Sequence, residues 1–222
     1  RDPEMSRGLG DVYKRQVTAN ISALRNKVKS LGEGVQPIKA EVMMSGSFND
    51  RPTITKPGLP IGTFWGYVVE GFDNDGNFIF QDNNGSVNGV LTGKPDGKID
   101  ENDKTDIGNP HPDFTYGFSV NLGYKNFDLS VDMMGVYGNE VYRNWDSSAY
   151  AQFNYRTGHL NRWHGEGTSN WDPILDPSRS VNLEASPYYV EDGSFFRIRN
   201  IELGYTFDPR LLNRIKLQSL RI

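Results

Sequence analysis

The chain has 222 residues, of which 36% are apolar and 23% are charged, as in a folded protein. Its formal net charge is −4 and it has no basic block that could follow a phosphate backbone, which argues against a nucleic-acid partner. It has no cysteine, which excludes disulfide scaffolds and thiol catalysis, and no apolar run approaches the roughly 20 residues of a membrane-spanning helix. Because 24 glycines and 12 prolines break the chain into short pieces, we predict an all-β fold.

The first sixteen residues differ in character from the rest of the chain. The run Ser6–Gln16 resembles, letter for letter, the conceptual translation of a transposase adapter used in sequencing libraries. Residues 1–16 also lack the apolar core of a signal peptide. We therefore interpret 1–16 as adapter-derived and 17–222 as protein truncated at both ends. A genuine polar N-terminal arm is the alternative.

Period-two alternation of apolar and polar residues predicts the strands. A weak alternation over Val17–Leu24 favours a strand, although one helical face would also fit. The alternation is strict over Phe114–Tyr124 and resumes over Phe127–Tyr137, which predicts a hairpin closed by two residues. Further strands are expected from Phe195 to Phe207 and from Lys216 onward.

The connections between these strands alternate between short and very long. Asp208–Ile215 is short, whereas Asn26–Pro112 and Gly138–Gly193 are long, and loops of that length are uncommon in compact soluble domains. Transmembrane barrels have this alternation, with the long loops outside the cell. A small hairpin is expected within the first long loop, from Thr63–Val69 and Asn77–Phe80. The alternative architecture is a soluble β-sandwich.

Several motifs in this order resemble the SusC/RagA-like TonB-linked receptors of the Bacteroidetes outer membrane. They are Pro60-Ile61-Gly62-Thr63-Phe64-Trp65-Gly66-Tyr67, Asp96-Gly97-Lys98-Ile99-Asp100, Ile107-Gly108-Asn109-Pro110-His111-Pro112-Asp113-Phe114-Thr115-Tyr116-Gly117, Asn126-Phe127-Asp128-Leu129-Ser130, Arg162-Trp163 and Asp192-Gly193-Ser194-Phe195-Phe196-Arg197-Ile198-Arg199-Asn200-Ile201-Glu202-Leu203-Gly204-Tyr205.

The resemblance implies a partial antiparallel transmembrane β-barrel, with about five of 22 strands and long extracellular loops. It implies import of glycans or peptides with a SusD-like surface lipoprotein, TonB contact through a missing N-terminal region, and contact with outer-membrane lipid. The alternative function is that of a soluble β-sandwich that binds carbohydrate. No catalytic arrangement of residues is evident, so we do not expect an enzyme.

The segment Thr92–Asp103 partly matches a twelve-residue calcium loop. Asp96, Asp100 and Asp103 occupy ligand positions, and Lys98 occupies the position that supplies a main-chain carbonyl. Thr92 and Lys94 replace the first two carboxylates of the pattern. Calcium binding is therefore an open hypothesis beside a loop held by turn chemistry alone.

Aromatic residues of the second long loop are the candidate ligand contacts, because exposed rings stack on sugars or peptide side chains. These candidates are Trp145, Tyr150, Trp163 and Trp171. A small loop core would use the same residue types. Arg197 and Arg199 share the parity of the apolar face and could pair with lipid phosphates, unless a bulge near Asn200 turns them elsewhere.

Overall fold

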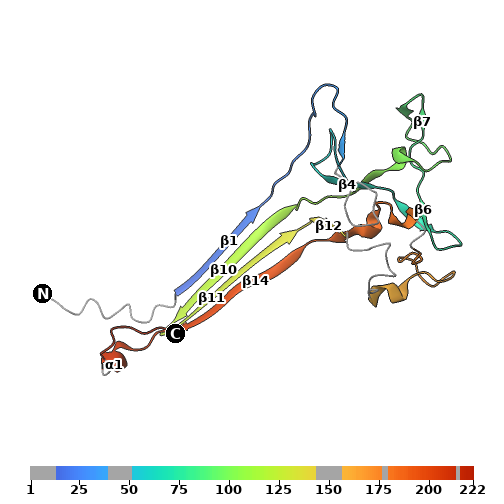
Figure 1. Ribbon diagram of the computed structural model, residues 1–222. Helices are drawn as coiled ribbons and strands as arrows, with labels where there is room; N and C mark the ends of the chain where they lie inside the picture. Colours follow the sequence, from blue (N-terminus) through green and yellow to red (C-terminus); the bar gives the residue numbers. More distant parts are fainter. Residues whose placement is uncertain (1–13, 40–51, 144–156, 177–179, 214–215) are drawn as a thin grey trace. The chain divides into compact units, whose positions relative to one another are not determined.

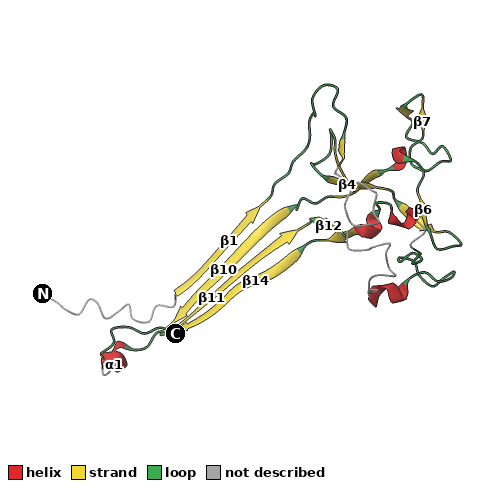
Figure 2. Ribbon diagram, in the orientation of Figure 1, coloured by secondary structure: helices red, strands yellow, loops and turns green. Residues whose placement is uncertain are grey.

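The computed structural model describes residues 14–39, 52–143, 157–176, 180–213 and 216–222, and the chain divides into two compact units (Figure 1). Unit 1 consists of Arg1–Leu24, Pro112–Gly138 and Ser194–Ile222, and unit 2 of Arg25–His111 and Asn139–Gly193. The regular structure is almost entirely strand (Figure 2). None of the helices in the described ranges is long and apolar enough to cross a membrane.

Unit 1 is built on one antiparallel sheet of four strands, in the order β1-β10-β11-β14. The strands are β1 (Lys14–Ser22), β10 (Phe114–Tyr124), β11 (Phe127–Tyr137) and β14 (Phe195–Tyr205). The predicted hairpin is confirmed, because β10 and β11 pair over their full lengths. Lys125 adopts φ 53°, which a tight two-residue turn requires.

The N-terminal strand is also confirmed, and it begins earlier than expected. Lys14, Arg15 and Gln16 pair with Gly123, Leu122 and Asn121 of β10. Almost any sequence can pair its backbone with the edge of a sheet. This pairing therefore does not test whether residues 1–16 derive from an adapter, and that interpretation stays a prediction. Residues 1–13 lie outside the described part of the chain.

The two faces of the sheet have opposite character. On one face, apolar side chains line up across the strands and remain largely exposed within unit 1; Val17, Ile201 and Leu203 are 59%, 63% and 67% exposed. On the other face, polar side chains bond across strands: Ser119 Oγ donates to Asp132 Oδ1 at 2.7 Å, and Ser130 Oγ donates to Asn121 Oδ1 at 2.7 Å. A soluble sandwich would pack the apolar face, so this arrangement does not support that alternative.

A bulge decides where the two arginines of β14 lie. The register with β11 shifts between Asp132 and Met133, which pair with Asn200 and Ile198, so Arg199 is the extra residue. The shift places Arg197 opposite Met134 on the polar face, where its guanidinium lies 5.3 Å from the centre of the Phe195 ring. The bulge near Asn200, which the sequence left open as the alternative, is therefore present, and it places Arg197 away from the apolar face.

Among the described residues, the last segment forms an isolated bridge where a strand was predicted from Lys216 onward. Thr206 and Arg221 form an isolated bridge, and Tyr205 and Ile222 exchange both backbone hydrogen bonds. Before it, Asp208 caps the short helix α1 (Pro209–Leu212) by accepting a hydrogen bond from Arg210 N. Arg221 Nη2 lies 2.6 Å from both Asp128 and Glu202, on the polar face of the sheet.

Unit 2 consists of short strands joined by turns. One sheet has the order β2-β3-β4-β9, and three further pairs are β5-β6, β7-β8 and β12-β13. The strands are β2 (Ile38–Lys39), β3 (Thr53–Thr55), β4 (Thr63–Gly66), β5 (Val69–Phe72), β6 (Phe78–Phe80), β7 (Ser86–Val87), β8 (Val90–Leu91), β9 (Thr105–Gly108), β12 (Glu140–Tyr142) and β13 (Val190–Asp192). The 3-10 helices are η2 (Glu101–Asp103), η3 (Thr157–Asn161), η4 (Ser180–Leu183) and η5 (Pro187–Tyr189).

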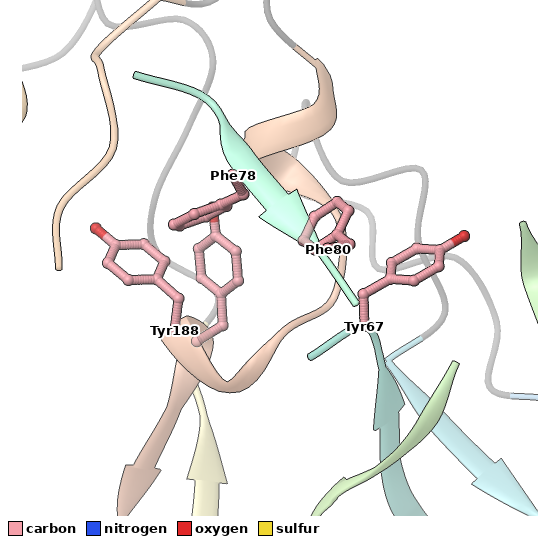
Figure 3. Close-up of a cluster of buried hydrophobic side chains, with 5 residues drawn as sticks. Tyr67, Phe78, Phe80 and Tyr188 are labelled. Atoms are coloured by element: carbon pink, nitrogen blue, oxygen red, sulfur yellow. The ribbon is translucent and has the colours of Figure 1, made fainter. Parts of the chain in front are cut away.

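An aromatic cluster forms the core of unit 2 (Figure 3). Its buried members are Tyr67, Phe78, Phe80, Tyr188 and Tyr189. The Tyr67 and Phe80 rings stack with their centres 4.8 Å apart, and the Tyr188 and Tyr189 rings meet edge to face at 4.9 Å. The cluster joins the two long connections of the chain, since its members come from both. The described parts of these connections are therefore packed structure.

The small hairpin in the first connection is shorter than predicted. β6 pairs with β5, whereas β4 pairs with β3 and β9. The strand breaks because Tyr67 N donates to Ala185 O, and a Cβ at Gly66 would lie 2.1 Å from that same carbonyl. The connecting turn is confirmed: the Asp73 carboxylate accepts hydrogen bonds from Asp75 N and Asn77 N.

Gly135 allows an aromatic contact to cross three strands, and this gives a first prediction. The Tyr116 ring lies over Gly135 and stacks on Phe196 with ring centres 6.4 Å apart; a Cβ at Gly135 would lie 2.2 Å from Tyr116 Cζ. We expect Gly135→Ala to lower the unfolding free energy of the receptor in detergent by about 1 kcal/mol, the worth of an aromatic pair. The control is Gly123→Ala, where the nearest atom lies 3.4 Å away. Equal effects would mean that the stack contributes nothing.

Candidate functional site

The four aromatic candidates divide into two that the structure describes and two that it does not. Trp145 and Tyr150 lie within 144–156, outside the described residues. Trp163 and Trp171 lie in unit 2, in the segment that follows η3. Their surroundings differ, and so do the roles that they can take.

Trp163 packs on the turn between β5 and β6. A Cβ at Gly76 would lie 2.3 Å from Trp163 Cε3, so the indole occupies the space over this glycine. Backbone hydrogen bonds from Trp163 N to Asp172 O and from Ile174 N to Gly76 O hold the two segments together. Trp163 is half-buried in the loop core, which is a structural position.

Trp171 remains available to a ligand. Its side chain is 60% exposed, and its ring centre lies 5.8 Å from that of Tyr188. Tyr188 is fixed in turn, because its hydroxyl donates to Asp172 Oδ1 at 2.9 Å. Trp171 therefore presents an aromatic surface on a rigid support, as a stacking contact requires.

In the segment Thr92–Asp103, carboxylates bind the backbone. Asp96 Oδ1 accepts from Lys98 N at 3.0 Å, and Asp100 Oδ1 accepts from Asn102 N at 2.8 Å as the cap of η2. Gly97 adopts φ 83°, so it makes the sharp turn that the calcium pattern assigns to it, and its N–H donates to Asp82 at 2.6 Å. The loop is held by its own side chains.

Asp103 is the most constrained carboxylate of this segment. It is 1% exposed; Oδ1 accepts from Asn83 N and Asn84 N, and Oδ2 accepts from Asp100 N. Burial by itself raises the pKa of Asp103, but these backbone N–H donors outweigh burial and hold the pKa below its usual value. The carboxylate is therefore charged, and both of its oxygens accept backbone N–H groups.

These bonds bear on the calcium hypothesis. In the described part of the chain, no group of three or more His, Asp or Glu side chains is arranged to hold a metal ion. The oxygens of Asp103 that would ligate the ion already accept backbone N–H groups. The geometry does not fit a calcium loop, and calcium binding stays an untested prediction.

A cavity of about 500 Å³ in unit 2 was not foreseen from the sequence. Its lining includes Lys56, Trp65, Gln81, Leu91 and Glu101, which come from five separated stretches of the chain. The Lys56 ammonium lies 3.5 Å above the centre of the Trp65 ring. Burial lowers the pKa of Lys56, and attraction to Asp106 partly opposes this effect.

The packing of Trp163 generates a prediction with a matched control. Gly76→Ala must displace the indole, whereas Gly89→Ala meets no atom within 4 Å; both glycines have similar positive φ values of 80° and 77°. Alanine is therefore similarly strained at both positions, and this strain cancels when the stabilities of the two variants are compared. We expect Gly76→Ala to lower the unfolding free energy by about 1–3 kcal/mol more than Gly89→Ala. Protease resistance of unit 2 in the intact receptor would measure the difference, and equal resistance would refute the packing role.

The role of Asp103 gives a third prediction. Asp103→Asn replaces one accepting oxygen by an N–H₂ group, so we expect a loss of about 1–3 kcal/mol of stability. Asp96→Asn, at an exposed position with one backbone bond, is the control and should cost less. Urea denaturation with and without calcium measures both. If calcium stabilises the wild type and neither variant, the loop is a metal site instead.

Comparison with known proteins shows which family the chain resembles in sequence. No family model matches the chain. The chain is 31% identical over 214 residues to the TonB-dependent receptor P3 of Formosa agariphila, covering 91% of this chain and 21% of the receptor. It is 26% identical over 194 residues to the TonB-dependent receptor SusC of Bacteroides thetaiotaomicron. The chain thus spans about a fifth of the length of the curated relatives that it matches.

The fold comparison agrees with the sequence comparison. The structure of the RagAB peptide transporter superposes with a TM-score of 0.69 at 21% identity, covering 94% of this chain and 22% of that one. Together with the all-β architecture and the two-faced sheet, these similarities identify the chain as a segment of a SusC/RagA-like TonB-dependent receptor, with the fold of a partial β-barrel.

Proposed function

We propose that this segment forms part of the wall and of the surface loops of an outer-membrane transporter. The observation that supports the proposal most directly is the sheet of unit 1, which exposes an apolar face and carries a hydrogen-bonded polar face. In a transmembrane barrel the apolar face meets lipid and the polar face lines the lumen.

The dimensions and the ends of the sheet support the same proposal. Strand β10 has 11 residues, so it extends about 33 Å, which spans about 25 Å at the usual tilt of about 40°. Aromatic pairs lie at both ends of the apolar face: Phe114 with Tyr137 at 5.1 Å, and Phe127 with Tyr205 at 4.7 Å. Such pairs correspond to the two aromatic girdles of a barrel.

The cargo that we propose is a glycan or a peptide. One similar structure is that of a peptide transporter, and the relatives are named as receptors, which supports uptake in preference to catalysis. We propose a SusD-like surface lipoprotein and TonB as partners of the whole receptor, following the family resemblance. Trp171, with its exposed ring, is the described candidate for contact with the cargo.

The lipid-facing role predicts very different losses of unfolding free energy for arginine substitutions at two neighbouring residues. Val120→Arg places a charge on the apolar face and should cost roughly 2–4 kcal/mol near the bilayer midplane. Ser119→Arg enters the polar face beside Asp132 and should cost much less. Unfolding of the receptor in lipid vesicles measures both variants. Equal costs, or a larger cost at Ser119, would refute the assignment of the faces.

Transport itself is tested in the bacterium that carries the receptor. A strain without the receptor should lose growth on a pool of glycans or on a pool of peptides as sole carbon source, and retain growth on the corresponding monomers. Restoring the gene should restore growth. Unchanged growth of the deletion strain on both polymer pools would contradict the proposed function.

A further inference from the structure

The cavity of unit 2 contains one positive charge without a bonded partner among the described residues. Lys56 lines the cavity, is partly buried, and places its ammonium over the Trp65 ring. No carboxylate of the described chain forms an ion pair with it, and the nearby Asp106 carboxylate accepts a hydrogen bond from Gly108 N. The Lys56 ammonium is attracted to Asp106 but forms no ion pair with it, so its burial is only partly compensated, and a ligand carboxylate would offset the remaining cost.

The other charged side chains of the cavity already have bonded partners. Glu101 lies between two ammonium groups, with Lys39 Nζ at 2.6 Å and Lys104 Nζ at 2.7 Å. Asp103 is saturated by the three backbone N–H groups described above. The remaining charge available to a ligand is therefore that of Lys56.

The rest of the lining can bind the body of a hydrophilic ligand. The side chains of Gln81 and Thr105 form no hydrogen bonds to the described residues, so their polar groups are free to bond. Val68 and Leu91 add apolar surface beside Trp65. A volume of about 500 Å³ falls within the range of small-molecule sites, and two or three sugar or amino-acid units would fit.

We propose that this cavity binds a carboxylate-bearing ligand, with the carboxylate on Lys56 and the ligand body against Trp65 and Gln81. A charge-assisted hydrogen bond to a partly desolvated ammonium gives the site its selectivity for anions. The carboxylate can belong to an acidic sugar or to a peptide, and both present the same group to Lys56. This inference deepens the proposed transport function, but binding can be measured without transport.

The test uses calorimetry on the intact receptor in detergent with two matched pairs of probes. One pair is N-acetyl-trialanine and its C-terminal amide, and the other is digalacturonate and its dimethyl ester. We expect the acid of at least one pair to bind, and its neutral partner to bind at least about tenfold more weakly, since a charged hydrogen bond is worth about 1.5–3 kcal/mol. The acid that binds identifies the source of the carboxylate.

Three variants assign the effect to Lys56. Lys56→Gln should weaken binding of the acid at least about tenfold, Lys56→Arg should retain it, and Lys29→Gln, an exposed lysine of unit 2, should leave it unchanged. The proposal fails if neither acid binds, if acid and neutral probe bind equally, or if Lys56→Gln binds the acid as the wild type does. If the deletion strain loses growth on the polymers but the receptor binds neither acid, this inference is refuted and the proposed transport function is retained.

Discussion

The alternation of side chains across an antiparallel sheet is the constraint on which the structure of unit 1 depends. Successive residues of a strand face opposite sides, so the strict period two of β10, which the first residues of β11 continue, commits one face to apolar and the other mainly to polar residues. The apolar face is exposed within the unit and requires an apolar environment, whereas the polar face binds itself through pairs such as Ser119 and Asp132. The alternation is interrupted at the Arg199 bulge, where one extra residue moves Arg197 to the polar face.

Unit 2 is stabilised differently, because its strands are too short to bury a large sheet face. Its core is the aromatic cluster around Phe78, and its turns are fixed by carboxylates that accept backbone N–H groups, as Asp73 and Asp103 do. Such carboxylates satisfy backbone donors that strands would otherwise pair. This local chemistry positions Trp171 and the cavity around Lys56, so the candidate ligand contacts lie on a supported framework.

The sequence predicted the long strands well and the loops poorly, for a physical reason. The hairpin from Phe114 to Tyr137 depends on neighbours in sequence, and its bounds were correct. Whether Trp163 is packed or exposed depends on Gly76, which is remote in sequence, and the Lys56 cavity joins stretches that no periodicity connects. The calcium pattern also depends on spacing alone. It placed carboxylates at the expected positions, but spacing does not reveal that the oxygens of Asp103 accept hydrogen bonds from backbone N–H groups.

The barrel assignment requires that the apolar face of the sheet meets lipid, and labelling of single cysteines measures which face does so. These 222 residues contain no cysteine, so single substitutions from Gly117 to Leu122 give a clean background for this segment. Each variant of the receptor, in lipid vesicles, carries a spin label whose exposure to oxygen and to a water-soluble nickel complex is compared. If the apolar face meets lipid, labels at positions 118, 120 and 122 have high oxygen exposure, and labels at positions 117, 119 and 121 have high nickel exposure. A reversed pattern, or none, would contradict the barrel assignment.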